Sequence, residues 1–360
     1  MAFLMQGLRG LPRYEPGEHE EGEGFVRLNT NESPFPPSPG VEKAVAEQID
    51  RLQFYNDPDC AALRAAFARV IGVTPDCVLC GNGSDEVLYW AFMAFADASH
   101  SILLPDVTYS YYDLFAAALG IALERAPLRE DFTVEAADYC GAGKTVLLAN
   151  PNAPTGYALP VSTIEEIVRS NPQSVVIIDE AYAGFGAESC VPLIRRYPNL
   201  LVTRTFSKAR SLAGARIGFA VGCPALIAEL ASVRNAVNLY SVSRMAQAAG
   251  VAACEENDYY VDNCRRIVAS RAYTTRALRE RGFTVLSSLT NFVFAKCGFM
   301  DAAAMQDALR ARGFLVRRWS APRIVDWLRI TIGTQAQMEA LIAAMDDIRK
   351  ESDGHAQRAD

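Results

Sequence analysis

The sequence contains few of the residue types on which many active sites depend. Its 360 residues include only three histidines, at positions 19, 100 and 355, and all three lie in polar segments. The nine cysteines are scattered through apolar segments, and the pair Cys77 and Cys80 is not followed by a second Cys or His pair at zinc-site spacing. We therefore expect no catalytic histidine, no metal site and no disulfide framework.

Two further absences limit the class of protein. No unbroken apolar run reaches the roughly 18 to 20 residues that a membrane-spanning helix needs. The net charge of -7 indicates no basic surface that would attract nucleic acid or an anionic membrane. The sequence therefore predicts a small-molecule enzyme of the cytoplasm, with no nucleic-acid partner and no membrane partner.

Short apolar runs alternate with amphipathic helical patterns through the first two thirds of the chain. The runs are residues 78–79, 101–104, 145–149, 175–178, 200–205 and 217–221. This alternation predicts the α/β class, with a largely parallel sheet covered by helices on both faces. Beyond residue 241 a long helical stretch over 243–281, strands near 284, 291 and 314, and a last helix from Gln335 predict a smaller α+β domain. We expect an N-terminal arm at 1–40 that joins the small domain, a large domain at 41–240 and the small domain at 241–360.

Polar residues follow several of the apolar runs, at the strand ends where such sheets bind ligands. The segment 81–86 lies between a predicted strand and the helix that starts at Val87. Its glycines and free amides suit a phosphate, and Ser84 is equally typical of an ordinary helix N-cap. The segment 149–156, Ala-Asn-Pro-Asn-Ala-Pro-Thr-Gly, by itself indicates only a tight turn.

Asp179 and Lys208 each follow a predicted buried strand. A carboxylate at the end of a buried strand is costly unless a charged group meets it. Lys208 is one of only five lysines, and a desolvated lysine near other cations becomes a nucleophile for carbonyl compounds. On its own, however, Lys208 is equally compatible with a salt bridge.

Taken together, these segments resemble the fold-type I aminotransferases, and among them the histidinol-phosphate aminotransferase family. The resemblance covers nearly the whole chain and rests on the order of the glycine-rich helix start, the NP-x-x-PTG turn, the D-E-x-Y strand end and the S-K-x-x-x-L-A-G-x-R segment. It implies a large domain with a mostly parallel seven-stranded sheet between helices, a smaller α+β domain, and pyridoxal 5'-phosphate (PLP) as the cofactor.

The resemblance also implies roles in the cofactor site. Lys208 would carry PLP, Asp179 would pair with the pyridine nitrogen, and Tyr182 would contact the ring oxygen. Tyr109 would stack on the ring, where the plain alternative is a core aromatic. The phosphate would be held by Ser84, Asp85, Ser207, Arg216 and, from a second subunit, Tyr55.

One position departs from the family pattern. Family members usually have Asn directly before Pro-Thr-Gly, and this chain has Ala153. Either Asn152 substitutes for the missing side chain or Tyr182 acts alone. Because one hydrogen bond is at stake, of roughly 1 to 3 kcal/mol, we expect tuning and not loss of activity.

Substrate recognition is implied at the two ends of the chain. Tyr14 lies in a segment that resembles the arm closing over the site, and Asn31 lies in one that resembles the N-terminal substrate loop. Arg329 would clamp the anionic group of the substrate, and Arg317 or Arg318 would add a second positive charge. The role of Tyr55 implies a homodimer with shared active sites.

The function that this resemblance implies is transamination of L-histidinol phosphate with 2-oxoglutarate, which yields imidazole acetol phosphate and L-glutamate in histidine biosynthesis (EC 2.6.1.9). Two other reactions on the same scaffold stay open: an aromatic or general amino-acid aminotransferase, and a phosphothreonine-type PLP decarboxylase. A non-catalytic regulatory protein is disfavoured, because no DNA-binding domain is attached.

Overall fold

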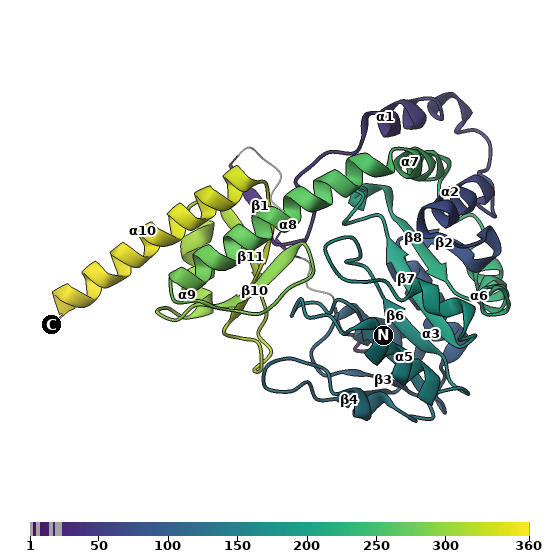
Figure 1. Cartoon of the computed structure of the whole chain (residues 1–360), viewed down its shortest axis with the longest axis horizontal. Coiled ribbons are helices and arrows are strands. Elements are labelled where there is room, and N and C mark those ends of the chain that lie inside the picture. Colours follow the sequence, from purple (N-terminus) through teal and green to yellow (C-terminus); the bar gives the residue numbers. More distant parts are fainter. Residues whose placement is uncertain (1–2, 5–7, 14–16, 19–23, 360) are drawn as a thin grey trace.

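The chain builds two β-sheets, seen in the computed structural model of residues 3–4, 8–13, 17–18 and 24–359 (Figure 1). The large sheet has seven strands in the order β2-β8-β7-β6-β5-β3-β4. These strands are β2 (Val78–Asn82), β3 (Ile102–Pro105), β4 (Leu123–Ala126), β5 (Thr145–Ala149), β6 (Val176–Asp179), β7 (Leu200–Thr205) and β8 (Ile217–Val221). Neighbouring strands are parallel except at β8, which is antiparallel to both β2 and β7. The predicted mostly parallel seven-stranded sheet is confirmed.

Helices cover both faces of the large sheet. Val176 and Ile178 of β6 face one apolar layer and Ile177 faces the other, as the two-residue period of a strand requires. The first layer contains side chains of α2 (Ala61–Ile71), α5 (Val161–Ser170) and α7 (Arg244–Glu255). The second layer contains side chains of α3 (Ser84–Phe95), α4 (Tyr111–Leu119) and α6 (Pro224–Val237). Burial on both faces explains the continuous apolar runs of the central strands.

The small sheet has five strands in the order β1-β11-β12-β10-β9. They are β1 (Val26–Leu28), β9 (Thr284–Val285), β10 (Phe292–Lys296), β11 (Phe314–Arg318) and β12 (Trp327–Thr331). It packs with α8 (Asn257–Glu280), α9 (Ala302–Arg310) and α10 (Gln335–Ala359), whereas α1 (Pro39–Ala46) packs on α7. Within the described part of the chain, no helix is both long enough and apolar enough to cross a membrane.

Three predicted element assignments were incomplete. The helical stretch over 243–281 is two helices, α7 and α8, because the backbone of Glu256 leaves the helical conformation between them. The sequence Leu-Glu-Arg-Ala of β4 lacks an apolar run because this strand forms an edge of the large sheet. The N-terminal arm contains β1, which is parallel to β11 and brings Leu28 into the core.

Candidate active site

A cavity of about 210 Å³ lies at the carboxyl ends of β5, β6 and β7, where the small sheet faces the large one. Most of the residues singled out in the sequence line it: Asn31, Ser84, Asp85, Tyr109, Asp179, Tyr182, Ser207, Lys208, Arg216, Arg317 and Arg329. The fold therefore brings together side chains from both ends of the chain, as expected for a ligand site at the strand ends of a parallel sheet.

Lys208 lies in the loop after β7, and its amine lines the cavity. The Nζ atom donates a hydrogen bond of 3.1 Å to the carbonyl oxygen of Thr30. Burial, and after it the positive charge of Arg329, lowers the pKa of Lys208 to about 8. A larger fraction of this amine is therefore neutral near pH 8 than in an exposed lysine, and the neutral form is the nucleophile.

Asp179 is buried at the end of β6, at the base of the cavity. Its carboxylate accepts hydrogen bonds from the hydroxyl of Tyr112 at 2.7 Å and from that of Thr203 at 2.9 Å. Burial raises the pKa of Asp179 to about 6, against the opposing effect of these two donors. Both partners are neutral hydroxyls, so this carboxylate is arranged to meet a cation that enters the cavity.

The start of α3 forms a second part of the cavity wall. Gly83 precedes the helix with a φ of 85°, and Asp85 in the first turn binds the guanidinium of Arg216 at 2.9 Å. Gly218 of β8 packs so closely that a Cβ there would lie 2.2 Å from the backbone nitrogen of Ser84. The free amides of this helix start, beside Arg216 and Ser207, suit a phosphate group.

Two tyrosines, Tyr109 and Tyr182, line the same cavity as Lys208 and Asp179. The hydroxyl of Tyr109 donates to the Asp85 carboxylate at 3.2 Å, which fixes its ring at the cavity edge. The hydroxyl of Tyr182 accepts a hydrogen bond of 2.8 Å from the side-chain amide of Asn31. Asn31 has a left-handed backbone with a φ of 57°, and Thr331 and Asn291 hold it from the small sheet. The predicted N-terminal substrate loop thus lies directly beside Tyr182.

Arg317 and Arg329 supply positive charge from the small sheet. They are register partners on the antiparallel strands β11 and β12, and both line the cavity. Arg318, one residue along the strand, faces the other side and donates to Gln306. Of the two arginines left open in the sequence, the structure brings Arg317 to the cavity.

Two other predicted residues, Asn152 and Tyr55, are not among the residues that line the cavity. The amide of Asn152 is held by the carbonyl of Val107, by Thr155 and by Thr108, whereas its neighbour Ala153 lines the cavity. The side chain of Tyr55 is 81% exposed. Tyr14 lies outside the described residues.

Sequence reasoning missed Tyr112, Thr203 and Trp319. Tyr112 and Thr203 bind Asp179, and Trp319 lines the cavity beside the two arginines. An available signal for Trp319 was its position directly after the strand that carries Arg317. For Thr203, the signal was its position as the register partner of Asp179 on the next strand.

These groups fit PLP. The helix start with Arg216 and Ser207 suits its phosphate, the buried carboxylate of Asp179 suits its protonated pyridine nitrogen, and the Lys208 amine suits its aldehyde. A mostly parallel sheet with such a site at its strand ends defines a fold-type I PLP-dependent enzyme, and PLP is the cofactor.

Comparison with known proteins narrows this class. Residues 23–345 match the family model of aminotransferase class I and II. A histidinol-phosphate aminotransferase of Dechloromonas aromatica is 44% identical over 351 residues, covering 96% of this chain and 99% of the relative. Another, of Bradyrhizobium diazoefficiens, is 46% identical over 346 residues, covering 96% and 99%.

A solved structure agrees with these relatives. The histidinol-phosphate aminotransferase of Sinorhizobium meliloti, in complex with pyridoxal-5'-phosphate, is 29% identical, covers 91% of each chain and has a TM-score of 0.81. The chain belongs to the aminotransferase class I and II family and, within it, to the histidinol-phosphate aminotransferases. It is a transaminase, and its substrates are an amino donor and an oxo acid.

Proposed function

We propose that the chain transfers the amino group of L-histidinol phosphate to 2-oxoglutarate, giving imidazole acetol phosphate and L-glutamate, as a step of histidine biosynthesis. One observation carries the proposal: a single cavity holds the Lys208 amine and a pair of arginines. Two arginines at one register position suit a doubly charged phosphate monoester better than a single carboxylate. The names of the relatives support the same donor.

Lys208 performs the proton transfer in this proposal. PLP, when bound, supplies the electron sink that makes the donor Cα acidic. The Lys208 amine would hold the cofactor and, as a free amine, would take the proton from the donor Cα. A base with a pKa near the working pH transfers protons efficiently, and the pKa of Lys208 is about 8.

The surrounding residues bind and orient. Asp179 holds the pyridine nitrogen in its protonated form, and Tyr182, oriented by Asn31, donates to the ring oxygen. Tyr109 would stack on the ring, and Ser84, Asp85, Ser207 and Arg216 would hold the phosphate group. Asn152 is turned toward Val107, so in this proposal Tyr182 makes the ring-oxygen contact without help from position 153.

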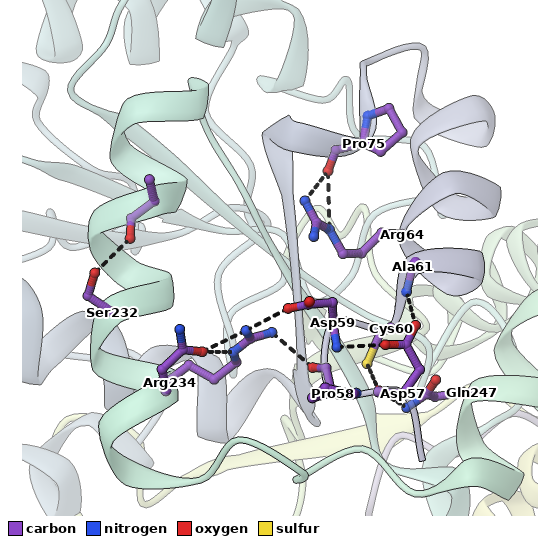
Figure 2. A network of polar contacts seen from close by, with 12 residues as sticks. Asp57, Pro58, Asp59, Cys60, Ala61, Arg64, Pro75, Ser232, Arg234 and Gln247 are labelled. Atoms are coloured by element: carbon purple, nitrogen blue, oxygen red, sulfur yellow. Dashed lines mark hydrogen bonds and ion pairs between the residues drawn. The ribbon is translucent and has the colours of Figure 1, made fainter.

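We also propose a homodimer in which Tyr55 reaches the PLP phosphate of the other subunit. Exposed apolar side chains gather in segments 49–55 and 237–240, and the rings of Tyr55 and Tyr240 lie 4.9 Å apart. The segment that follows Tyr55 is held by Arg234, which donates to the carbonyl of Pro58 and to the side-chain carboxylate of Asp59, and by Gln247, which donates to the carbonyl of Asp57 (Figure 2). A rigid, apolar and exposed surface of this kind is typical of a subunit interface.

Mixing two inactive variants tests the shared site. Tyr55→Ala and Lys208→Ala subunits, each inactive at limiting PLP, are unfolded and refolded together in equal amounts. Random pairing makes half of the dimers hybrids, each with one intact site, so activity returns to about a quarter of wild type. No recovery, with hybrid dimers present by mass spectrometry, would contradict the shared site.

A donor panel tests the reaction. Histidinol phosphate should convert the visible absorbance of bound PLP to that of pyridoxamine phosphate more efficiently than phenylalanine or tyrosine, and Lys208→Ala should lose both the cofactor band and turnover. Equal or better reaction with the aromatic amino acids would favour a general aminotransferase. Release of carbon dioxide without an oxo acid would favour a decarboxylase.

The cytoplasm is the proposed location, and the nine free thiols suit a reducing compartment.

A further inference from the structure

Trp319 stands between the two arginines of the substrate pocket. Its ring centre lies 5.0 Å from Cζ of Arg329 and 5.6 Å from Cζ of Arg317, both within cation–π range. The ring of Phe292 lies 5.4 Å from the same Arg329 Cζ, and this guanidinium also donates a hydrogen bond of 2.9 Å to the carbonyl of Asn29. Aromatic packing therefore contributes to its orientation together with this hydrogen bond. Two like charges at one register position repel each other, and a shared aromatic face offsets part of that repulsion.

Trp319 begins the loop between β11 and β12, and this loop is anchored on the large sheet. Arg323, in the middle of the loop, forms an ion pair with Asp106 and donates to the carbonyls of Leu128 and Arg129. Its guanidinium also lies over the ring of Phe132 at 5.3 Å. Asp106 is followed by Thr108 and Tyr109, which line the cavity. The contacts of Arg323 therefore set the position of the loop relative to the cavity wall formed by Thr108 and Tyr109.

An apolar cluster underlies the same loop. Val107, Leu128 and Phe132 come from the large-sheet side, and Phe294, Ile324 and Trp327 from the small-sheet side. Trp319 packs on this bridging cluster at one edge, with its ring centre 6.4 Å from that of Phe294. Trp319 is thus held by packing while part of its surface lines the cavity.

We propose that Trp319 is a specificity-determining residue, which orients Arg317 and Arg329 as one seat for a phosphate monoester. This inference rests on the proposed function and adds a residue that orients the two arginines that bind the anionic group of the substrate. Without the indole, the two guanidiniums adopt more orientations, and a dianion must order them on binding. A donor whose anion is a carboxylate loses less, because it engages fewer of their hydrogen-bond donors.

The test compares Trp319→Leu with Trp319→Phe in the PLP-loaded enzyme. The Leu variant should raise KM for histidinol phosphate about tenfold with kcat within about twofold, and should weaken binding of inorganic phosphate by a similar factor. The Phe variant keeps an aromatic face and should recover most of both losses. Trp327→Phe is the matched control, because Trp327 lies in the bridging cluster, stacked on Phe294, without lining the cavity.

Three results would overturn the inference: unchanged phosphate binding in the Leu variant, equal loss for histidinol phosphate and phenylalanine, or a Phe variant no better than Leu. Calorimetric measurement of inorganic phosphate binding tests the role of Trp319 even if the wild-type enzyme prefers another donor. The donor panel with the wild-type enzyme tests only the proposed function, so failure of the one proposal can be told from failure of the other.

Discussion

Arg317 and Arg329 are paired across neighbouring antiparallel strands with both side chains at the cavity. Adjacent like charges destabilise a sheet unless an anion or an aromatic face compensates. Arg317→Gln and Arg329→Gln should therefore each raise KM for histidinol phosphate about tenfold to a hundredfold, since a charge-assisted hydrogen bond is lost. Steady-state kinetics measure this.

Arg318→Gln is the matched control for these two variants. Its side chain donates to Gln306 on the other face of the strand, so KM should stay within about twofold of wild type. A loss as large as that of Arg317→Gln would show that overall charge, and not position in the cavity, determines substrate affinity.

Asp179→Asn should stabilise the cofactor-free protein while it impairs the enzyme. The folded pKa of about 6 lies above the usual 3.8, so the native state binds this proton more tightly than the unfolded chain does. The stability that this proton contributes is present below about pH 4 and is lost as pH rises through 6, a change of about 3 kcal/mol. Urea unfolding of both proteins from pH 4 to 8 measures the difference. Parallel curves for wild type and variant would contradict the prediction.

Arg329 should also control the reactivity of Lys208. Its positive charge lowers the Lys208 pKa, second only to burial, so Arg329→Gln should raise that pKa above about 8. In the variant a smaller fraction of the Lys208 amine is neutral at pH 8. Capture of added PLP by the cofactor-free variant should therefore be slower at pH 8 than in the wild type. Rates of PLP capture from pH 7 to 10, followed by absorbance, should show the curve displaced to higher pH. A displacement to lower pH would exclude this electrostatic coupling.

Gly218→Ala should disrupt the phosphate end of the site. A Cβ at this position would lie 2.2 Å from the carbonyl carbon of Gly83 and from the amide nitrogen of Ser84, so the start of α3 must move. We expect PLP affinity to fall about tenfold to a hundredfold, measured by fluorescence titration. Gly214→Ala is the control, because a Cβ there meets nothing within 4 Å. Equal losses in both variants would point to a general effect of glycine replacement.

Ala153→Asn should tighten cofactor binding. Ala153 lines the cavity, whereas the neighbouring Asn152 is committed to Val107, Thr155 and Thr108. The introduced side-chain amide adds one donor toward the ring oxygen, so the PLP dissociation constant should fall by about threefold to tenfold. The double variant Ala153→Asn, Tyr182→Phe should recover part of what Tyr182→Phe alone loses. If Ala153→Asn binds PLP no better than wild type, Tyr182 remains the sole contact.

The positions of Asp179 and Lys208 at the cavity were predictable because both residues follow apolar runs that are visible in the sequence. Asp179 and Lys208 each come at or just after the end of a central strand, and a polar residue in that position stands out. The position of Trp319 directly after the predicted strand near residue 314 was visible in the sequence. Its contact with Arg317 and Arg329 was not, because that contact depends on a loop anchored by Arg323. The edge strand β4 was missed because it has a solvent-facing side and no apolar run.

The pairing of β1 with β11 has a consequence for biosynthesis on the ribosome. The carbonyl of Thr30 accepts the hydrogen bond of the Lys208 amine, and β1, just before Thr30, pairs with residues 314–316 of β11. β1 therefore stays unpaired in the nascent chain until residues 314–316 have emerged. A nascent chain can form the contact between α3 and β8 as soon as Gly218 has emerged, but it can complete the cavity only after β11 and β12 have been made.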